Sequence, residues 1–222
     1  MNIVKQYPYI FIRHIFIEIS CLYKRGDIMS RQIWKPGTMI YPLPAVLVSM
    51  GDFHKQADFN MVTVAWTGTL CTNPAMAYIS LRPERYSYNI IKKYGNFVIN
   101  VTTEELAKAT DFCGVKSGRD IDKFEHTGLT PIKSTMVSAP SVKESPISIE
   151  CIVKDILPLG SHHMFLSEVL SVSADESLMD NTGKFHLDKA KPLIYSHGKY
   201  YGTGKSIGGF GFSVKKKKKD TK

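Results

Sequence analysis

Short apolar segments separated by proline or glycine recur along most of this chain, and the pattern favours a fold built mainly from β-strands. Residues 61–70 (MVTVAWTGTL) alternate Val, Val and Trp with Thr and Ala, the period-2 pattern of a strand with one buried face. Further strand patterns cover residues 45–49, 77–81, 96–101, 147–157 and 163–172. The Pro158-Leu159-Gly160 segment between the last two predicts a hairpin connection.

Helical patterns are fewer and shorter than the strand patterns. Residues 84–94 place their large apolar side chains on roughly one face of a helix. Pro83 suits the start of this helix because its missing N–H would be unpaired there in any case. Gly95 suits its end, since glycine readily adopts the left-handed conformation that closes many helices.

A second helix is expected after the strand at residues 96–101. Thr102 and Glu105 match a capping box, which predicts a helix over residues 104–112 that Gly114 ends. Residues 121–126 suit one further helical turn. Many strands with a few interposed helices predict a mainly β domain with a few helices, closed or sandwich-like, and not a doubly wound α/β sheet.

The formal net charge of +9 is unevenly distributed, and this decides what it means. Residues 215–222 hold six lysines and one aspartate, a net charge of +5, and residues 1–28 carry +2. Subtraction leaves +2 for residues 29–214. The nearly neutral body argues against a nucleic-acid-binding surface, and we expect no nucleic-acid partner. The lysine run reads as a solvated tail, with a patch for nucleic acid or an acidic partner as the alternative.

The N-terminal 28 residues do not fit a membrane span or a secretory signal. Residues 7–23 are strongly apolar, but Arg13, His14 and Glu18 interrupt them. A span needs about 20 largely apolar residues, and a signal peptide needs an unbroken apolar core. We therefore expect an extension outside the core at residues 1–28, or alternatively an amphipathic segment that lies on a surface or binds a partner. The domain itself is expected at residues 29–214, followed by the tail.

The four cysteines stand far apart, at Cys21, Cys71, Cys113 and Cys151. They contain no CxxC pair, and no histidine lies at zinc-finger spacing from them. Reduced, buried thiols in a cytoplasmic protein are the expected state.

One segment has the composition of a phosphate site. Ser80, Arg82, Arg85 and Ser87 follow a predicted strand and lead into a predicted helix N-terminus. A phosphate dianion is bound by cationic donors, hydroxyls and unpaired backbone N–H groups, all of which occur here. An ordinary capped helix with surface arginines explains the same residues equally well.

Three other segments leave two interpretations open. The strand at residues 60–69 could read the polar edge of a flat heterocycle, with Trp66 as a wall, although a core position for Trp66 is favoured. His162 and His163 would point to opposite faces of an extended chain, as a hairpin-rim pair or with one donor near a redox substrate. The loop at residues 112–120 could bend over a ligand, with Cys113 either reactive or buried.

Common nucleotide-binding motifs are missing from the sequence. The chain has no GxxxxGK[ST] phosphate loop and no GxGxxG after a predicted strand. It also lacks any cluster of residues typical of a catalytic triad or a metal site, and we expect no metal.

In chain order, these segments resemble the flavin reductase-like family with the FMN-binding split β-barrel, and within it the flavoredoxin-like group. The resemblance runs from about Trp34 to Val214. The residues that carry it are YPLP at 41–44, NMVTVAWTG at 60–68, SLRPERYS at 80–87, CGVKSGRD at 113–120, DKF at 122–124, ESP at 144–146, GSHHMFLSEV at 160–169 and YSHG at 195–198.

The resemblance implies a homodimeric flavoprotein with non-covalent FMN close to the subunit interface. By position, the isoalloxazine edge would meet the backbone of Thr63, Val64, Ala65 and Trp66. The phosphate would be held by Ser80, Leu81, Arg82 and Ser87, with Arg85 and Tyr86 beside it. Cys113, Gly114 and Ser117 would belong to a loop near the flavin. His162 matches a family histidine near the hydride-transfer face, although Ser161 replaces the aspartate of the family's Gly-Asp-His.

The implied function is that of an oxidoreductase, namely an NAD(P)H-dependent flavin reductase that passes hydride or electrons through FMN. The alternative is a flavoredoxin-type electron carrier that a partner protein reduces. An electron donor or acceptor protein is therefore a possible partner. A third interpretation, from another class, is a nucleic-acid-binding barrel that uses the lysine tail.

Overall fold

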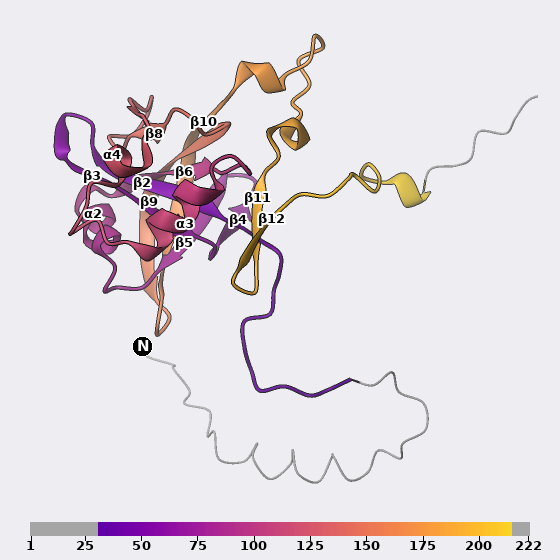
Figure 1. Ribbon diagram of the computed structural model, residues 1–222, viewed down its shortest axis with the longest axis horizontal. Coiled ribbons are helices and arrows are strands. Elements are labelled where there is room, and N and C mark those ends of the chain that lie inside the picture. Colours follow the sequence, from indigo (N-terminus) through magenta and orange to yellow (C-terminus); the bar gives the residue numbers. More distant parts are fainter. Residues whose placement is uncertain (1–30, 215–222) are drawn as a thin grey trace, which may run out of the picture. The chain divides into compact units, whose positions relative to one another are not determined.

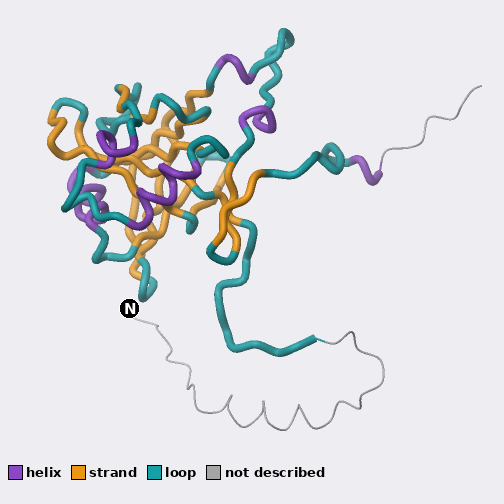
Figure 2. Tube along the Cα trace, viewed as in Figure 1, coloured by secondary structure: helices purple, strands orange, loops and turns teal. Residues whose placement is uncertain are grey.

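The computed structural model describes residues 31–214 of the chain. It divides into two units at Met39/Ile40, and the described residues 31–39 form no helix or strand. The predicted extension at residues 1–28 and the lysine tail at 215–222 lie outside the described residues. The remainder, from Ile40 to Val214, contains every helix and strand of the described chain (Figures 1 and 2).

A seven-stranded antiparallel sheet forms the centre of the domain, with strand order β3-β2-β6-β9-β10-β5-β4. Its strands are β2 Val46–Asp52, β3 Lys55–Val64, β4 Thr67–Cys71, β5 Met76–Leu81, β6 Asn96–Val101, β9 Ile147–Pro158 and β10 His163–Ala174. The two edge strands, β3 and β4, are neighbours in sequence, so the sheet curls until its edges approach each other. This mainly β architecture confirms the predicted fold class.

The hairpin between β9 and β10 is confirmed, with His163 paired to Pro158 across the turn. The prediction of one strand over residues 61–70 is wrong, because β3 ends at Val64 and β4 begins at Thr67. β3 pairs with β2 while β4 pairs with β5, so the chain has to cross between opposite edges of the sheet at Ala65 and Trp66.

The chain buries this sheet on both faces, which explains its continuous apolar runs. Within β2, Val46, Val48 and Met50 belong to a core cluster with α2 (Tyr86–Tyr94) and β5. Leu47 points the other way, into a second cluster with α3 (Ala107–Val115) and α4 (Lys123–Thr127). Each fully buried aliphatic side chain contributes about 1.5–3 kcal/mol to folding, so the two clusters hold the helices against the sheet.

Of the helix signals, those for α2 and α4 are confirmed and the capping box is wrong. Gly95 closes α2 in the left-handed conformation, with φ 68°. The Thr102 hydroxyl donates to the Ala45 carbonyl instead of capping a helix, and α3 begins only at Ala107. Gly114 lies inside α3, where a Cβ would approach the Thr63 Cβ to 3.3 Å, so the absence of a side chain lets the helix pack closely on β3.

Smaller elements complete the domain. A three-stranded sheet joins β1 (Leu43–Pro44), β11 (Leu193–Ser196) and β12 (Lys199–Gly202), and a two-stranded sheet joins β7 (Pro131–Ile132) and β8 (Ser141–Val142). Short 3-10 turns cover Glu176–Leu178, Leu187–Ala190 and Phe212–Val214. None of the helices within residues 31–214 is both long and apolar enough to cross a membrane.

Candidate functional site

Two adjoining cavities lie beside β3 and the segment that leads from β5 into α2, and the first also borders the three-stranded sheet. The first has a volume of about 430 Å³ and is mainly lined by aromatic, apolar and small side chains. Its lining is formed by Ala45, Val62, Thr63, Val64, Ala65, Trp66, Ser80, Leu81, Arg82, Arg85, Asp111, Gly114, Val115, His162, Tyr195, Gly198 and Tyr200.

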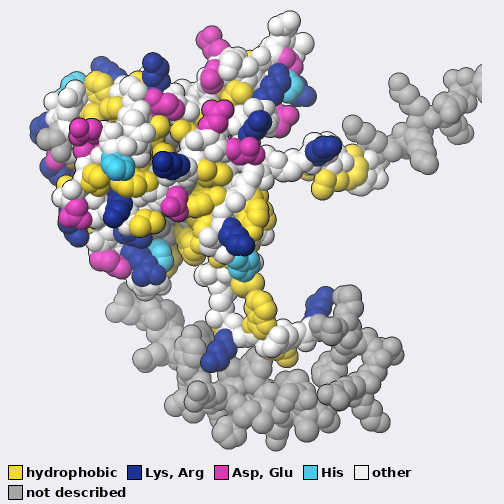
Figure 3. Space-filling model, viewed as in Figure 1, with side chains coloured by type: hydrophobic (Ala, Val, Ile, Leu, Met, Phe, Trp, Pro, Cys, Tyr) yellow, Lys and Arg dark blue, Asp and Glu magenta, His cyan; other side chains and the backbone are white. Residues whose placement is uncertain are grey.

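The second cavity, of about 390 Å³, is strongly basic. Val62, Arg82 and Arg85 line both cavities, so the two adjoin. The rest of its lining consists of Glu84, Tyr86, Ser87, Lys116, Ser117, Gly118, Arg119 and Lys123. Five basic side chains therefore face one carboxylate, which makes this cavity suited to an anion. On the face of the domain in Figure 3, by contrast, basic and acidic side chains are mixed.

Backbone polar groups are available beside the first cavity because β3 is an edge strand. One side of β3 pairs with β2, and the other has no strand partner within residues 31–214. The crossing at Ala65 and Trp66 is fixed by the Ser80 N–H, which donates to the Trp66 carbonyl at 2.8 Å. Trp66 is half-buried, lines the cavity and belongs to neither core cluster, contrary to the favoured core position.

His162 covers part of the first cavity and stacks on Trp66. The two rings lie nearly parallel, with an angle of 7° and centroids 5.9 Å apart. Burial lowers the pKa of His162, and the positive charge of Arg82 lowers it further, which favours the neutral imidazole. His163 points elsewhere, and its Nδ1 lies 2.9 Å from the Tyr88 hydroxyl. The two histidines therefore face different surroundings, as their adjacency predicted.

The N-terminus of α2 opens on the second cavity. Arg85 occupies the N-cap position and makes no side-chain capping bond. The Tyr88 N–H donates to the Arg85 carbonyl, so the N–H groups of Tyr86 and Ser87 are the ones that stay available to a ligand. Ser87, in the first turn, is buried, and its hydroxyl accepts a hydrogen bond from Asn60 Nδ2 at 2.9 Å. This contact with β3 orients the hydroxyl at the cavity wall.

Loop 116–119 closes the second cavity over the same helix end. A Cβ on Gly118 would lie 2.2 Å from Asn60 Oδ1 and 3.0 Å from Tyr86 Cδ1, so only glycine fits this approach. The Arg119 guanidinium lies 5.7 Å from the Tyr86 ring centroid and donates to the Glu84 carbonyl at 3.4 Å. The loop thus brings basic side chains to the helix N-terminus.

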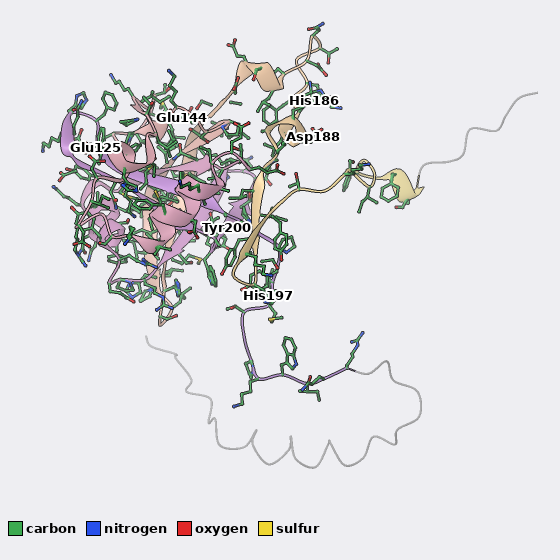
Figure 4. All side chains as sticks on the ribbon, viewed as in Figure 1. Glu125, Glu144, His186, Asp188, His197 and Tyr200 are labelled. Carbon is green, nitrogen blue, oxygen red and sulfur yellow. The ribbon has the colours of Figure 1, made fainter. Side chains whose placement is uncertain are left out.

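Tyr200 forms part of the opposite wall of the first cavity. It extends from β12 toward the rest of the domain (Figure 4), and its ring lies edge-on to Tyr195 with centroids 5.8 Å apart. Burial and the nearby Asp111 carboxylate raise the pKa of Tyr200 to about 12, which keeps the phenol protonated. Tyr200 lies on β12 and Asp111 on α3, which are distant in sequence, so no local sequence pattern predicted that these two residues meet.

The structure brings most of the sequence-predicted residues to these cavities. The first collects Thr63, Val64, Ala65, Trp66, Ser80, Leu81, Gly114 and His162, the second collects Tyr86, Ser87 and Ser117, and both include Arg82 and Arg85. Sequence reasoning did not assign Asp111, Tyr195, Tyr200, Lys116, Arg119 or Lys123 to the site. Tyr195 and the last three stand in segments that carry the family resemblance, which could have identified them.

Cys113 is the exception among the predicted site residues, because it lines neither cavity. Its side chain is fully buried in the second core cluster. Burial raises the pKa of the thiol to about 11, which makes it unreactive. The described cysteines Cys71, Cys113 and Cys151 are free, and residues 31–214 contain no group of side chains that could hold a metal ion.

Solved structures with the same fold are known. Flavoredoxin of Desulfovibrio vulgaris (Miyazaki F) is 30% identical, with a TM-score of 0.76 over 83% of this chain and all of that chain. A split barrel domain protein from Shewanella frigidimarina is 24% identical, with a TM-score of 0.67 over 74% of this chain and 84% of that chain. The second similarity concerns the fold alone.

The sequence comparisons agree with this fold. A protein from Archaeoglobus fulgidus is 32% identical over 167 residues, which cover 75% of this chain and 91% of that protein. The family model described as "Flavin reductase like domain" matches residues 38–204. The family and its neighbours support a flavin-related oxidoreductase function. From the extent of the match and the fold that it shares, the chain belongs to the flavin reductase-like domain family.

Proposed function

We propose that this protein is an oxidoreductase that binds FMN without a covalent bond across the two cavities. The observation that carries the proposal is their pairing, an aromatic and apolar cavity directly beside a strongly basic one. Their volumes lie within the roughly 300–1,000 Å³ of typical ligand pockets. A flat ring system joined by a flexible chain to a phosphate matches this division.

The residues present fit each part of FMN. Thr63 to Trp66 would meet the polar edge of the ring system with backbone groups, since they line the first cavity at the end of β3 and at the crossing that follows it. Arg82, Arg85 and Ser87 would hold the phosphate together with the first two N–H groups of α2. Gly118 supports this fit because a side chain there would displace the loop that closes the basic cavity.

Flavin, when bound, supplies the redox chemistry, either by hydride transfer or by single electrons. The protein's own residues would bind and orient it. Trp66 and His162 would wall one side and exclude water, while Tyr195 and Tyr200 would limit the other. His162, kept neutral by burial and by Arg82, would offer a hydrogen bond near the reacting face without adding charge.

NAD(P)H is the electron donor that we propose first, which makes the protein a flavin reductase. The position of His162 on the wall of the ring cavity, beside Arg82, favours this donor. The alternative is a flavoredoxin-type carrier that receives electrons from a protein, and the 30% identity with a flavoredoxin favours it.

One experiment separates these two functions. Purified protein is loaded with FMN under anaerobic conditions and mixed with NADH or NADPH. A flavin reductase loses its visible flavin absorbance, whereas a carrier keeps it until a reduced partner protein is added. Protein that is colourless as purified and cannot be reconstituted with FMN would contradict both functions.

We also propose a homodimer in the cytoplasm. Ile207, Phe210 and Phe212 are largely exposed on the segment that follows β12, and exposed apolar side chains of this size commonly mark an interaction surface. The free thiols of the described cysteines fit a reducing compartment. Light scattering coupled to size-exclusion chromatography tests the dimer, and a monomeric mass at micromolar concentration would oppose it.

A further inference from the structure

Lys123 is a buried ammonium group with no carboxylate partner among the described residues. Only 3% of the residue is exposed, and no salt bridge within residues 31–214 involves it. Its Nζ donates to the Met61 carbonyl at 2.7 Å and to the Cys113 carbonyl at 2.8 Å. A charge buried with neutral partners only is costly, and it therefore calls for an explanation.

The ammonium group of Lys123 has one N–H donor without an acceptor among the described residues. A lysine ammonium carries three N–H groups, and the two carbonyls use two of them. No described residue accepts the third. Lys123 lines the basic cavity, which it shares with Arg85 and Ser87. The group is thus positioned to meet an anion in that cavity.

The other charged residues around Lys123 also favour an anion in this cavity. Arg82, Arg85, Lys116 and Arg119 line the same cavity and are all positive, while Glu84 is its one carboxylate and lies 3.8 Å from Arg82. From α3, Lys123 faces the carbonyl and the thiol of Cys113, and from β3 it faces the Met61 carbonyl. Every charged group that lines the cavity, except Glu84, therefore disfavours a further positive charge until an anion enters.

We propose that Lys123 is a buried phosphate-binding residue that contributes a positive charge and an N–H donor to the FMN phosphate and so distinguishes FMN from riboflavin. The proposal rests on the proposed function, since it assigns the phosphate to the basic cavity. It adds that phosphate binding and the protonation of Lys123 are linked. The two carbonyl contacts hold the ammonium in place before the ligand arrives, so little side-chain entropy is lost on binding.

The linkage has a defined direction. Burial lowers the pKa of Lys123 to about 8, and the Arg85 charge contributes to this shift. A phosphate dianion beside the ammonium favours the charged form and raises this pKa. FMN binding therefore takes up a proton above about pH 8, and FMN affinity falls as the pH rises past that value, by up to about tenfold per pH unit.

The test compares dissociation constants of FMN and riboflavin, measured by calorimetry or flavin fluorescence between pH 7 and pH 10, a range that brackets the Lys123 pKa of about 8. Titration of the ring system is common to both ligands and cancels in their ratio. In the wild type, the preference for FMN over riboflavin should decline above about pH 8. A preference that stays constant over this range would overturn the proposal.

Variants distinguish phosphate binding from a purely structural role. Lys123→Met should reduce the preference for FMN by roughly 10- to 100-fold at pH 7 and remove its pH dependence. Lys116→Met removes one exposed charge from the same cavity, and it should lower the preference while keeping the pH dependence. An unchanged preference in Lys123→Met would show that Lys123 only ties α3 to β3, and would overturn the proposal.

A further variant tests the proposal even if Lys123→Met does not fold. Lys123→Arg keeps the charge but does not deprotonate in this range, so it should retain the FMN preference at pH 7 and show no decline at higher pH. A decline equal to that of the wild type would contradict the assignment. If the wild type binds neither FMN nor riboflavin, the proposed function fails instead, which is a separate outcome.

Discussion

The rings of Trp66 and His162 stack nearly parallel on the wall of the first cavity, although they stand far apart in sequence. Trp66 lies at the crossing from β3 to β4, and His162 ends the turn before β10. The pair exists because the sheet places β4, β5 and β10 side by side, with Thr67 and Phe165 both paired to Ile79. It forms one wall of the proposed ring site and connects it to Arg82.

Loss of His162 should affect the electron donor more than the cofactor. For His162→Ala we expect a rise of about 3- to 10-fold in the KM for NAD(P)H, the effect of losing one neutral hydrogen bond or stacking contact. The preference for FMN over riboflavin should change by less than about twofold, since His162 lines the ring cavity and not the basic cavity. Stopped-flow reduction and titration with FMN and riboflavin measure the two effects. His126→Ala, which removes a ring stacked on Phe112, is the control.

The protonation of His162 provides a second prediction. Burial and the nearby Arg82 charge lower its pKa, so the ring should titrate below its ordinary value of 6.5. Arg82→Ala should move this pKa upward, because a neighbouring positive charge is lost. The ring resonances in an NMR titration report the change. No upward movement, or an equal movement in Lys154→Ala, would contradict the electrostatic coupling.

Phosphate recognition is tested at the edge of the basic cavity. Arg82→Ala should weaken FMN binding by roughly tenfold while riboflavin binding changes little, because riboflavin lacks the phosphate. Ser87→Ala should act in the same direction. Lys92→Ala removes an exposed charge at the far end of α2 and serves as the matched control. Equal losses for FMN and riboflavin would show that Arg82 does not meet the phosphate.

The close approach of Gly118 to Asn60 makes a steric prediction. A Cβ at Gly118 would lie 2.2 Å from Asn60 Oδ1, so Gly118→Ala must displace the loop or the Asn60 side chain that orients Ser87. We expect FMN affinity to fall by about tenfold or more, in line with an overpacking cost of about 1–3 kcal/mol. Gly209→Ala meets no atom within 4 Å and should bind FMN like the wild type.

A buried carboxylate allows a prediction on stability. Glu150 is 1% exposed and accepts hydrogen bonds from the N–H groups of Thr135, Met136 and Val137, at 2.9, 2.6 and 3.1 Å. Glu150→Gln replaces one acceptor oxygen with a donor, and it should lower the free energy of unfolding by about 1–3 kcal/mol. Urea denaturation measures this change. Glu144→Gln, at an exposed carboxylate that accepts a hydrogen bond from the Thr130 N–H, should cost clearly less.

Much of the secondary structure could be predicted because it depends on local periodicity. The segments at residues 77–81, 96–101 and 147–157 are strands in the structure, close to the predicted boundaries. Gly95 ends α2 because its backbone conformation is a local property. The capping box failed at Thr102, where a hydroxyl that suits a helix end instead donates to the Ala45 carbonyl of a distant segment.

In the candidate site, too, the residues that local sequence patterns identify differ from those that depend on long-range packing. The segments with Thr63 to Trp66 and Arg82 to Ser87 were identified from the residues and from the family that they resemble, because those residue types directly suit a ring edge and a phosphate. The sequence did not show that Cys113 lines neither cavity, because the side that a helical residue presents to its neighbours depends on packing. Its thiol lies in the second core cluster, whereas Lys123, ten positions later, lines the basic cavity.

By itself, therefore, the sequence determined a mainly β domain, its principal strands, the family and the two segments that line the site. Only the tertiary structure decided that residues 61–70 split at Trp66, that Tyr200 and His162 wall one cavity, and that Lys123 carries a buried charge without a carboxylate partner among the described residues. The physical reason is that periodicity and composition act over a few residues. Burial, charge and cavity shape instead depend on which distant strands and helices the sheet order brings into contact.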